Sequence, residues 1–324
     1  MTQRKLTSAR VREMVKRQAV PKWGPAYVPA IKATRGEAPS LSKVSIVASS
    51  LLQRGVHALS KSEQACVALA LYHPGLFELK EQHVMARMPA EHPLLGHPRA
   101  TGMKLSTTTG TIGIAERLDI ISQHPKVHEV VRSTEGDMSR MVTAPWIGDL
   151  LLFLADERGP YCLSWDVKRY DGDHGKPGPL DWTERTAPRR VRAADARERV
   201  YVEYMRELNI RIVRTARSMM DDMLVINLIR LLVLHTQPID LAPEAHVDLL
   251  YAFDEALLSG TPPTQVITTF IKFGIDRLQS KRVLEQAIWE RRIRSDLFSA
   301  WSVDFPLSPE QRDPLLVHSD WFAR

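Results

Sequence analysis

The chain has 324 residues, 44% hydrophobic and 25% charged, values typical of a globular protein with an apolar core. No apolar run reaches the roughly 18 residues that a membrane span needs, and the basic, polar N-terminus lacks the hydrophobic stretch of a secretory signal. The two cysteines, Cys66 and Cys162, are too few for a disulfide framework or a cysteine zinc site. We therefore expect a cytoplasmic protein that has no membrane partner.

The net charge of +6 is concentrated in an N-terminal arm, residues 1–35. This arm carries nine lysine and arginine residues against one acid, Glu13, a net +8, so residues 36–324 sum to −2. Val11, Met14 and Val15 predict a short amphipathic helix over 7–18. The arm could contact a DNA backbone or be a solvated basic tail, and charge alone does not choose. Its candidate DNA-binding residues are Arg4, Lys5, Arg10, Arg12, Lys16 and Arg17.

The next elements alternate between helix and strand. The Ala- and Leu-rich segment 61–72 predicts a helix, which His73-Pro74-Gly75 ends. A strand is expected over 76–85, and clusters of Pro, Gly, His and Thr predict a loop or insertion over 86–113. Short strands are expected over 127–132 and 141–144. The role of the wider region 86–140 stays open.

The most informative feature is a predicted β-hairpin over 148–168. Two apolar segments flank the turn Asp156-Glu-Arg-Gly159, which reads as a four-residue connection containing glycine. If Ala155 pairs with Pro160, Asp149 lies directly opposite Asp166, and the alternation of the strand places Lys168 on the same face. Like charges at that separation are destabilising, so two opposed carboxylates require a cation.

This arrangement is chemically suited to phosphodiester cleavage. Carboxylate oxygens suit Mg²⁺ or Mn²⁺, and a lysine beside the metal can orient the attacking water or stabilise charge on the phosphate. The spacing alone is weak evidence, because D…(D/E)-x-K occurs by chance in proteins of this size. The competing interpretation is a solvated hairpin face with a surface ion pair. The acids interrupt strongly apolar strands, and this favours a functional site.

A third carboxylate could complete a metal site. Glu63 falls in the first turn of the 61–72 helix, where Ser60-Lys-Ser-Glu63 also fits a helix-capping box. From local pattern the cap is favoured, and Glu81, near the end of a strand, is equally ambiguous. Histidines 83, 92, 97 and 174 lack the partners and spacing of a zinc site.

The C-terminal half changes character near residue 217. A turn-rich loop over 171–179 precedes an expected helix over 191–208 and strand over 210–215, after which the pattern is helical. The arginine-rich run 185–199 includes Arg189, Arg190 and Arg192, for which a solvated helix face is favoured over DNA-backbone contact. Expected helices are 219–235, 243–259, 263–273 and 280–297. The last two could form a helix-turn-helix, although simple packing or partner docking is the commoner explanation.

Taken together, the motifs resemble the TnsA family of transposon-end endonucleases over most of the chain. The resemblance rests on Tyr27-Val-Pro29, Leu59-Ser-Lys-Ser-Glu63, Leu79-Lys-Glu-Gln82, Gly96-His-Pro98, the Asp149 and Asp166-x-Lys168 hairpin, Arg197 to Asn209, and Phe270 to Ile275. It implies an α/β fold: a restriction-endonuclease-like nuclease domain with a mixed sheet flanked by helices over 1–217, including the arm, and an all-helical, helix-turn-helix or winged-helix-like domain over 218–324.

The resemblance also implies the site and its partners. Glu63, Asp149, Asp166 and Lys168 would be catalytic, with Glu63, Asp149 and Asp166 as ligands of Mg²⁺, for which Mn²⁺ could substitute. The chain departs from the family in carrying Asp166 where members can carry Gln. The enzyme would cut the 5′, non-transferred strand at transposon ends in a bacterial nucleoid. A TnsB-like DDE transposase would cut the 3′ ends, and a TnsC-like AAA+ regulator would contact the C-terminal domain.

Two other functions remain open at this point. The first is a stand-alone restriction or defence nuclease of the same fold, which would cut DNA without partners. The second is a non-catalytic DNA-binding assembly subunit that keeps the fold. Cleavage by the purified chain alone would favour the first of these. Equal cleavage by wild type and by Asp149→Ala and Lys168→Ala variants would contradict the site.

Overall fold

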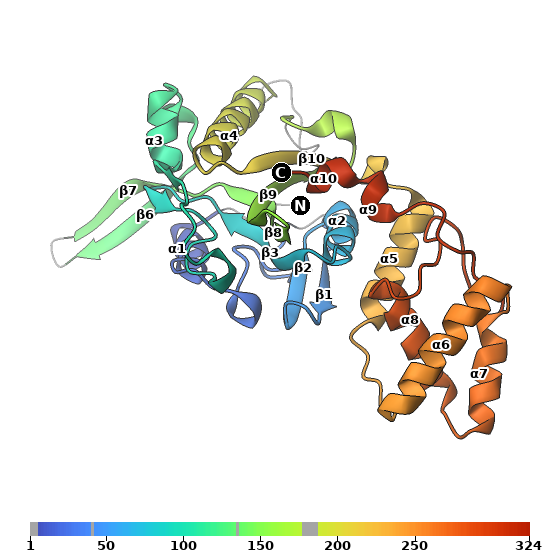
Figure 1. Cartoon of the computed structure of the whole chain (residues 1–324). Helices are drawn as coiled ribbons and strands as arrows, with labels where there is room; N and C mark the ends of the chain where they lie inside the picture. Colours follow the sequence, from blue (N-terminus) through green and yellow to red (C-terminus); the bar gives the residue numbers. More distant parts are fainter. Residues whose placement is uncertain (1–5, 40–41, 134–135, 177–186) are drawn as a thin grey trace.

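The computed structural model describes residues 6–39, 42–133, 136–176 and 187–324 (Figure 1). Within these ranges it has a mixed α/β part, built on a four-stranded sheet, and a helical C-terminal part. The sheet order is β10-β9-β8-β3, formed by β3 (Leu76–Val84), β8 (Ile147–Asp156), β9 (Gly159–Lys168) and β10 (Arg211–Ala216). β10 runs parallel to β9, whereas the other neighbours are antiparallel, so the sheet is mixed, as expected.

The β8–β9 hairpin has the register predicted from the sequence. Ala155 pairs with Pro160, and the ladder runs to the pair Leu150 and Trp165. Asp149 and Asp166 are the next residues in the same register. The connection is shorter than predicted, because Asp156 and Gly159 also pair and leave a two-residue turn. Gly159 has φ +100°, a conformation that glycine adopts without strain and that a tight hairpin turn needs.

The two faces of the sheet bury different cores. Leu150, Leu152 and Leu154 on β8 belong to a large core shared with α2 (Lys61–Leu71) and the C-terminal helices. Leu151 and Phe153 alternate with them and pack in a second core on the side of α4 (Ala187–Glu207). Strand alternation therefore assigns Asp149 to the α4 side of the sheet. Pro188 in the first turn of α4 favours its early start, four residues before the helix predicted over 191–208.

The N-terminal arm is partly docked onto the sheet. Helix α1 (Ser8–Arg17) matches the helix predicted over 7–18, and it buries Val11 and Met14. The chain then turns through a short 3-10 helix, Gly24–Ala26, and runs along β3, where the Ala30 amide donates to the Gln82 carbonyl (3.1 Å). A hairpin of β1 (Ser45–Ser49) and β2 (Arg54–Ala58) follows, which the sequence analysis did not identify.

Region 86–143 is more structured than predicted. It contains β4 (Ala90–Glu91), β5 (Thr107–Thr108), helix α3 (Gly110–Arg117), and short 3-10 helices at Pro98–Ala100 and Ile121–Gln123. The predicted loop over 86–113 is therefore wrong at its end, where α3 begins at Gly110. Strands β6 (Lys126–Ser133) and β7 (Gly136–Thr143) pair with each other and project as a hairpin (Figure 1).

The C-terminal part consists of helices that share a core with α2. Helices α5 (Asp222–Leu234), α6 (Pro243–Ser259) and α7 (Pro263–Lys272) agree with the prediction within a few residues. Helix α8 (Arg277–Trp289) ends eight residues before the predicted 297, because Arg291 takes a left-handed conformation (φ 63°) that no helix continues. The short 3-10 helix Arg217–Met219 separates β10 from α5 near the expected boundary, which stays a prediction.

The last residues return to the sheet instead of ending among the helices. Helix α9 (Pro314–Val317) leads to α10 (Ser319–Phe322), which lies beside β10 (Figure 1). The Trp165 indole donates to the carbonyl of Trp321 (3.0 Å), and the Tyr161 hydroxyl donates to that of Phe322 (2.9 Å). Two parts of the chain far apart in sequence are thereby joined. Among the described residues, none of the helices is both long and apolar enough to cross a membrane.

Candidate active site

Asp149, Asp166 and Lys168 meet at the end of the β8–β9 hairpin. The Lys168 ammonium forms an ion pair with the Asp166 carboxylate and lies 3.5 Å from Asp149 Oδ2. The same Asp149 oxygen accepts a hydrogen bond from the Val167 amide (2.9 Å). The predicted convergence of these three side chains on one face is therefore found. The lysine lies within ion-pair distance of both carboxylates and supplies positive charge between them.

The surroundings of Asp166 and Lys168 shift their pKa values in opposite directions. Burial alone would raise the pKa of Asp166, but the positive charge of Lys168 and its hydrogen bond outweigh burial, so the pKa is lowered. Burial alone would lower the pKa of Lys168, and the two carboxylates raise it instead. Asp166 is thus held ionised and Lys168 protonated, the charge states in which a carboxylate can bind a cation and an ammonium group can bind an anion.

His174 forms a contact that the sequence analysis missed. Its Nδ1 lies 2.6 Å from Asp166 Oδ2, on the opposite carboxylate oxygen from Lys168. The imidazole is almost fully buried, and its Nε2 has no hydrogen-bond partner in the described chain. The loop after β9 therefore fixes the orientation of Asp166. The turn-rich sequence 171–179 indicated a loop but could not show that it folds back onto the hairpin.

A small cavity opens over the carboxylates on the α4 side. It measures about 50 Å³ and is lined by Asp149, Asp166 and Lys168 together with Lys176 and Arg197. Arg197 is anchored by a hydrogen bond to the carbonyl of Ile147 (2.9 Å). Lys176 and Arg197 bring positive charge to the cavity beside the carboxylate pair, and Glu198 brings a further negative charge. Arg197 was noted in sequence only as one of a run of arginines, where its spacing gave no sign of this position.

Glu63 lies in the first turn of α2, near enough to Asp149 for the two charges to interact. Ser60 caps the helix by accepting a hydrogen bond from the Glu63 amide (3.1 Å), so the predicted cap is confirmed. The carboxylate itself accepts from the Leu59 amide (2.9 Å) and from the Gln82 side chain (3.0 Å). Burial, together with the nearby charge of Asp149, raises the pKa of Glu63 to about 7. Capping and a place in the carboxylate site therefore coexist in this one residue.

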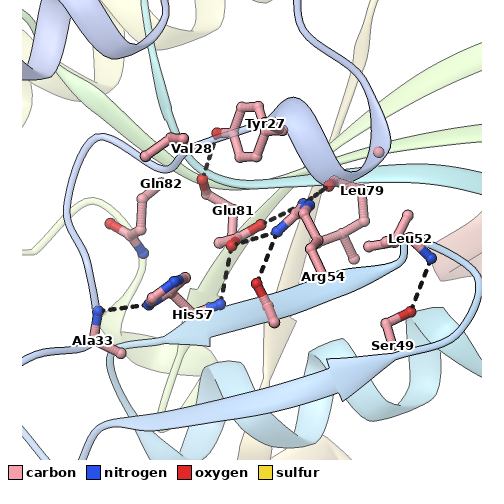
Figure 2. A network of polar contacts seen from close by, with 12 residues as sticks. Tyr27, Val28, Ala33, Ser49, Leu52, Arg54, His57, Leu79, Glu81 and Gln82 are labelled. Carbon is pink, nitrogen blue, oxygen red and sulfur yellow. Dashed lines mark hydrogen bonds and ion pairs between the residues drawn. The ribbon is translucent and has the colours of Figure 1, made fainter. Parts of the chain in front are cut away.

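Glu81, the alternative third acid, belongs to a different network (Figure 2). The Arg54 guanidinium donates to both Glu81 oxygens (2.8 and 2.9 Å), and the His57 amide adds a third bond (2.9 Å). Burial raises the pKa of Glu81, and these donors oppose that rise. Because its oxygens are already paired, Glu81 is not available to complete the site. Glu63 is the better candidate of the two.

Gln82 connects Glu63 to the sheet through an unusual backbone. Glu81 pairs with Leu150 and His83 with Gly148, so Gln82 lies opposite Asp149. Its φ is 49°, in the left-handed region that costs a non-glycine residue about 1–2 kcal/mol. The carbonyl of Gln82 accepts hydrogen bonds from the Ala30 amide and from the Gln18 side chain (3.2 Å). The N-terminal arm thus holds the kink that aims Gln82 at Glu63.

The donor chemistry of this site suits a hard divalent cation. The carboxylates of Glu63, Asp149 and Asp166 are the oxygen ligands that Mg²⁺ and Mn²⁺ prefer. Burial, and after it the charge of Asp149, raises the pKa of Glu63 to about 7. No cluster of three or more His, Cys, Asp or Glu side chains that could hold a metal was found among the described residues. The three-ligand assignment stays a prediction that requires side-chain movement.

The predicted DNA-binding arginines of the arm are largely engaged within the protein. Arg17 forms a two-pronged ion pair with Glu37 (2.7 and 2.8 Å), Arg12 pairs with Glu129 (2.5 Å), and Arg10 donates to the Glu37 carbonyl. Lys16 is exposed and forms no ion pair among the described residues. Arg189 and Arg192 on α4 are exposed and Arg190 is half-buried. Arg4 and Lys5 lie outside the described residues.

The four histidines considered for zinc do not gather. His83 is buried on β3, where burial lowers its pKa to about 3, and burial likewise lowers the pKa of His92 to about 4. His97 packs edge-to-face against Trp23, with the ring centroids 4.6 Å apart, and His174 contacts Asp166.

A scan against protein-family models found no match to this chain, and a search of curated protein sequences found no match either.

Proposed function

We propose that this protein is a Mg²⁺-dependent DNA endonuclease with a restriction-endonuclease-like fold, cutting the 5′ strand at transposon ends. One observation carries the proposal: Asp149, Asp166 and Lys168 converge at the end of one hairpin, with Glu63 electrostatically coupled to Asp149. Burying acidic groups side by side is costly unless a cation compensates them. Lys168 compensates Asp149 and Asp166, whereas Glu63 forms no ion pair among the described residues, and a structural role gives no reason for that cost.

Each residue of the site has a defined task in such a reaction. Glu63, Asp149 and Asp166 would hold the metal, which supplies an activated water and neutralises charge on the phosphate. Lys168 would orient that water or stabilise the negative charge that develops. Lys176 and Arg197, which line the same cavity, would bind the scissile phosphate. His174 would keep Asp166 in place through its contact with Oδ2.

The C-terminal helices offer a surface for a protein partner. Three side chains of α6, Val247, Tyr251 and Leu258, are 63%, 69% and 71% exposed. Their spacing of four and seven residues aligns them along one face of the helix. Apolar stripes of this kind commonly mark protein contacts. The stripe supports docking of a TnsC-like AAA+ regulator on this part, while a TnsB-like transposase would cut the opposite strand.

The proposal is tested by strand-specific nicking of a transposon end in the presence of the partner transposase and Mg²⁺. Asp149→Ala and Lys168→Ala should each lower the nicking rate about 10²- to 10³-fold. Glu157→Ala is the matched control, because Glu157 is an exposed acid in the turn at the far end of the same hairpin. Its nicking rate should equal that of wild type.

Each result of this assay has a distinct meaning. Equal nicking by wild type and the two site variants would overturn the site. Cutting by the purified chain without a partner would favour a stand-alone nuclease of the same fold. Absence of cutting under all conditions, with DNA binding retained, would favour the assembly-subunit alternative.

A further inference from the structure

A second, larger cleft lies between the N-terminal arm, β3, the segment 86–95 and the C-terminal end of α4. Its volume is about 380 Å³, within the range of about 300–1,000 Å³ typical of small-molecule sites. Leu151 forms part of its floor, and Tyr204, Met205 and Leu208 of α4 form one wall. It is distinct from the cavity over Asp149, which is lined by the earlier turns of the same helix.

His83 lines this cleft with both ring nitrogens unpaired. Its side chain is buried, and neither Nδ1 nor Nε2 has a hydrogen-bond partner in the described chain. The imidazole packs against Gly148, where an added Cβ would come within 2.0 Å of the ring. Buried polar groups are nearly always paired. The glycine thus makes room for a ring whose hydrogen-bonding groups the protein leaves unsatisfied.

Lys80 contributes a buried positive charge to the same cleft. Its ammonium lies 3.6 Å from the centroid of the Trp23 ring and 5.0 Å from that of Phe153. No carboxylate of the described residues forms an ion pair with it. Burial lowers the pKa of Lys80 to about 8, while Glu78 opposes that change. Aromatic faces stabilise the cation only in part, so an anion in the cleft would gain a direct partner.

The other charged residues that line the cleft carry a net positive charge, which favours an anion. Arg17 and Lys22 contribute positive charges and Glu91 a negative one, while Pro21, Pro93 and Leu95 add apolar surface. Arg17 is paired with Glu37, so Lys80 is the innermost free cation among the described lining residues. A hydrated inorganic ion would leave the apolar walls uncovered. An anionic head group on an apolar body would satisfy both kinds of surface.

We propose that this cleft binds a small organic anion, an aromatic or branched aliphatic carboxylate or phosphate monoester, with its head group on Lys80 and His83. Its body would lie against Leu151, Met205 and Leu208. The proposal does not rest on the nuclease function, because none of these residues belongs to the candidate active site. The bound molecule would also join the arm to α4, since the two form opposite walls of the cleft.

Isothermal titration calorimetry and Trp23 fluorescence test this directly, using benzoate, phenyl phosphate, inorganic phosphate and the neutral benzyl alcohol. The two aromatic anions should bind wild type, and Lys80→Met should weaken that binding at least about tenfold, as expected for the loss of a buried charged partner. Ala90→Trp, which fills the rim of the cleft without removing a core group, should also abolish binding. Lys104→Met removes an exposed lysine outside the cleft and should leave binding unchanged.

The outcomes separate the proposal from its alternatives. Absence of binding by every probe would mean that water alone fills the cleft, and would overturn the proposal. Equal binding by wild type and Ala90→Trp, or equal affinity for benzyl alcohol and benzoate, would overturn it as well. Thermal melting of each variant establishes folding, and Ala90→Trp carries the test if Lys80→Met does not fold. Nicking activity plays no part in the readout.

Discussion

Glu63 and Glu81 are two buried glutamates close to Gln82. The Gln82 side chain donates a hydrogen bond to Glu63, and Glu81 precedes Gln82 in the chain. The two carboxylates differ in the charge of the groups around them. The carboxylate of Glu81 receives two bonds from the Arg54 guanidinium and one from the His57 amide (Figure 2). The carboxylate of Glu63 receives neutral donors only, from Leu59, Ser60 and Gln82, and it is close enough to Asp149 for the two charges to repel.

This contrast separates a buried acid that has a structural role from one for which we propose a functional role. A buried carboxylate with a matched cation has its charge partly compensated within the protein, and losing that cation is costly. A buried carboxylate that faces another one is destabilised until something positive arrives from outside. Glu81 is of the first kind and Glu63 of the second. The predictions below test this difference, from the largest expected effect to the smallest.

Removing the partner of Glu81 should produce the largest loss of stability. Arg54→Met keeps the apolar stem but leaves the Glu81 carboxylate buried without its cation, so the free energy of unfolding should fall by about 3–5 kcal/mol. Urea denaturation at pH 7 measures this change. Arg206→Met is the matched control, since Arg206 forms an exposed ion pair with Glu203 that should contribute little. Equal effects of the two substitutions would mean that the Glu81 network is not a structural anchor.

Glu63 has no cationic partner among the described residues, and the pH dependence of stability tests its environment. Its pKa in the folded state is about 7 against an ordinary value of 4.5, so the folded state binds the proton more tightly than the unfolded state does. The resulting stabilisation is complete below pH 4.5 and is lost as pH rises through about 7. The loss is roughly 3 kcal/mol, from 1.36 kcal/mol per pKa unit.

The measurement compares the free energy of unfolding of wild type and Glu63→Gln between pH 4.5 and pH 8, without divalent cations. Subtracting one profile from the other removes the contributions of other groups, such as His83, whose lowered pKa acts in the opposite sense. Wild type should lose stability relative to Glu63→Gln as pH rises. Parallel profiles would show that Glu63 is as well compensated as Glu81.

The sequence predicted those parts of the site that depend on local pattern. Hairpin register follows from strand alternation and a tight turn, so the opposition of Asp149 and Asp166 and the position of Lys168 could be read from the chain. The cap at Ser60 is local for the same reason. The choice between Glu63 and Glu81 was not local, because it depends on Arg54, in a hairpin that the sequence analysis did not identify.

Long-range contacts account for most of what was missed. The left-handed backbone of Gln82 is held by Ala30 and Gln18, and no pattern within β3 indicates it. His174 reaches Asp166 only because the loop after β9 folds back. Helix α3 begins at Gly110, whose φ is +81° and which packs closely against the backbone of Met88. The composition of this segment predicted a loop because composition does not reveal that contact. Tertiary context decided each of these features.

Mg²⁺ should supply Glu63 with the positive charge that Arg54 already supplies to Glu81. Because the metal would bind the folded state alone, Mg²⁺ at ten times its dissociation constant should raise the free energy of unfolding by about 1.4 kcal/mol. Melting curves at pH 8 with and without the metal measure this. The increase should disappear in Asp149→Asn and persist in Glu81→Gln. An equal increase in wild type and Asp149→Asn would place the metal elsewhere.

The same distinction between paired and unpaired charge applies to the basic arm, where the expected effect is smallest. Arg17 is engaged with Glu37, whose pKa the guanidinium lowers to about 2, whereas Lys16 is exposed. If the arm contacts DNA, Lys16→Gln should reduce the slope of log binding constant against log salt by about 0.9, one phosphate contact, without changing the melting temperature.

Arg17→Gln should do the reverse, because it removes an internal ion pair and leaves the DNA-facing charge in place. Its melting temperature should fall, and the difference from wild type should shrink as pH falls from 4.5 towards 2 and Glu37 becomes protonated. Its salt slope should stay close to that of wild type. The opposite result would be a reduced salt slope for Arg17→Gln and an unchanged slope for Lys16→Gln. It would mean that the ion pair between Arg17 and Glu37 opens when DNA binds, and that Arg17 then contacts the DNA.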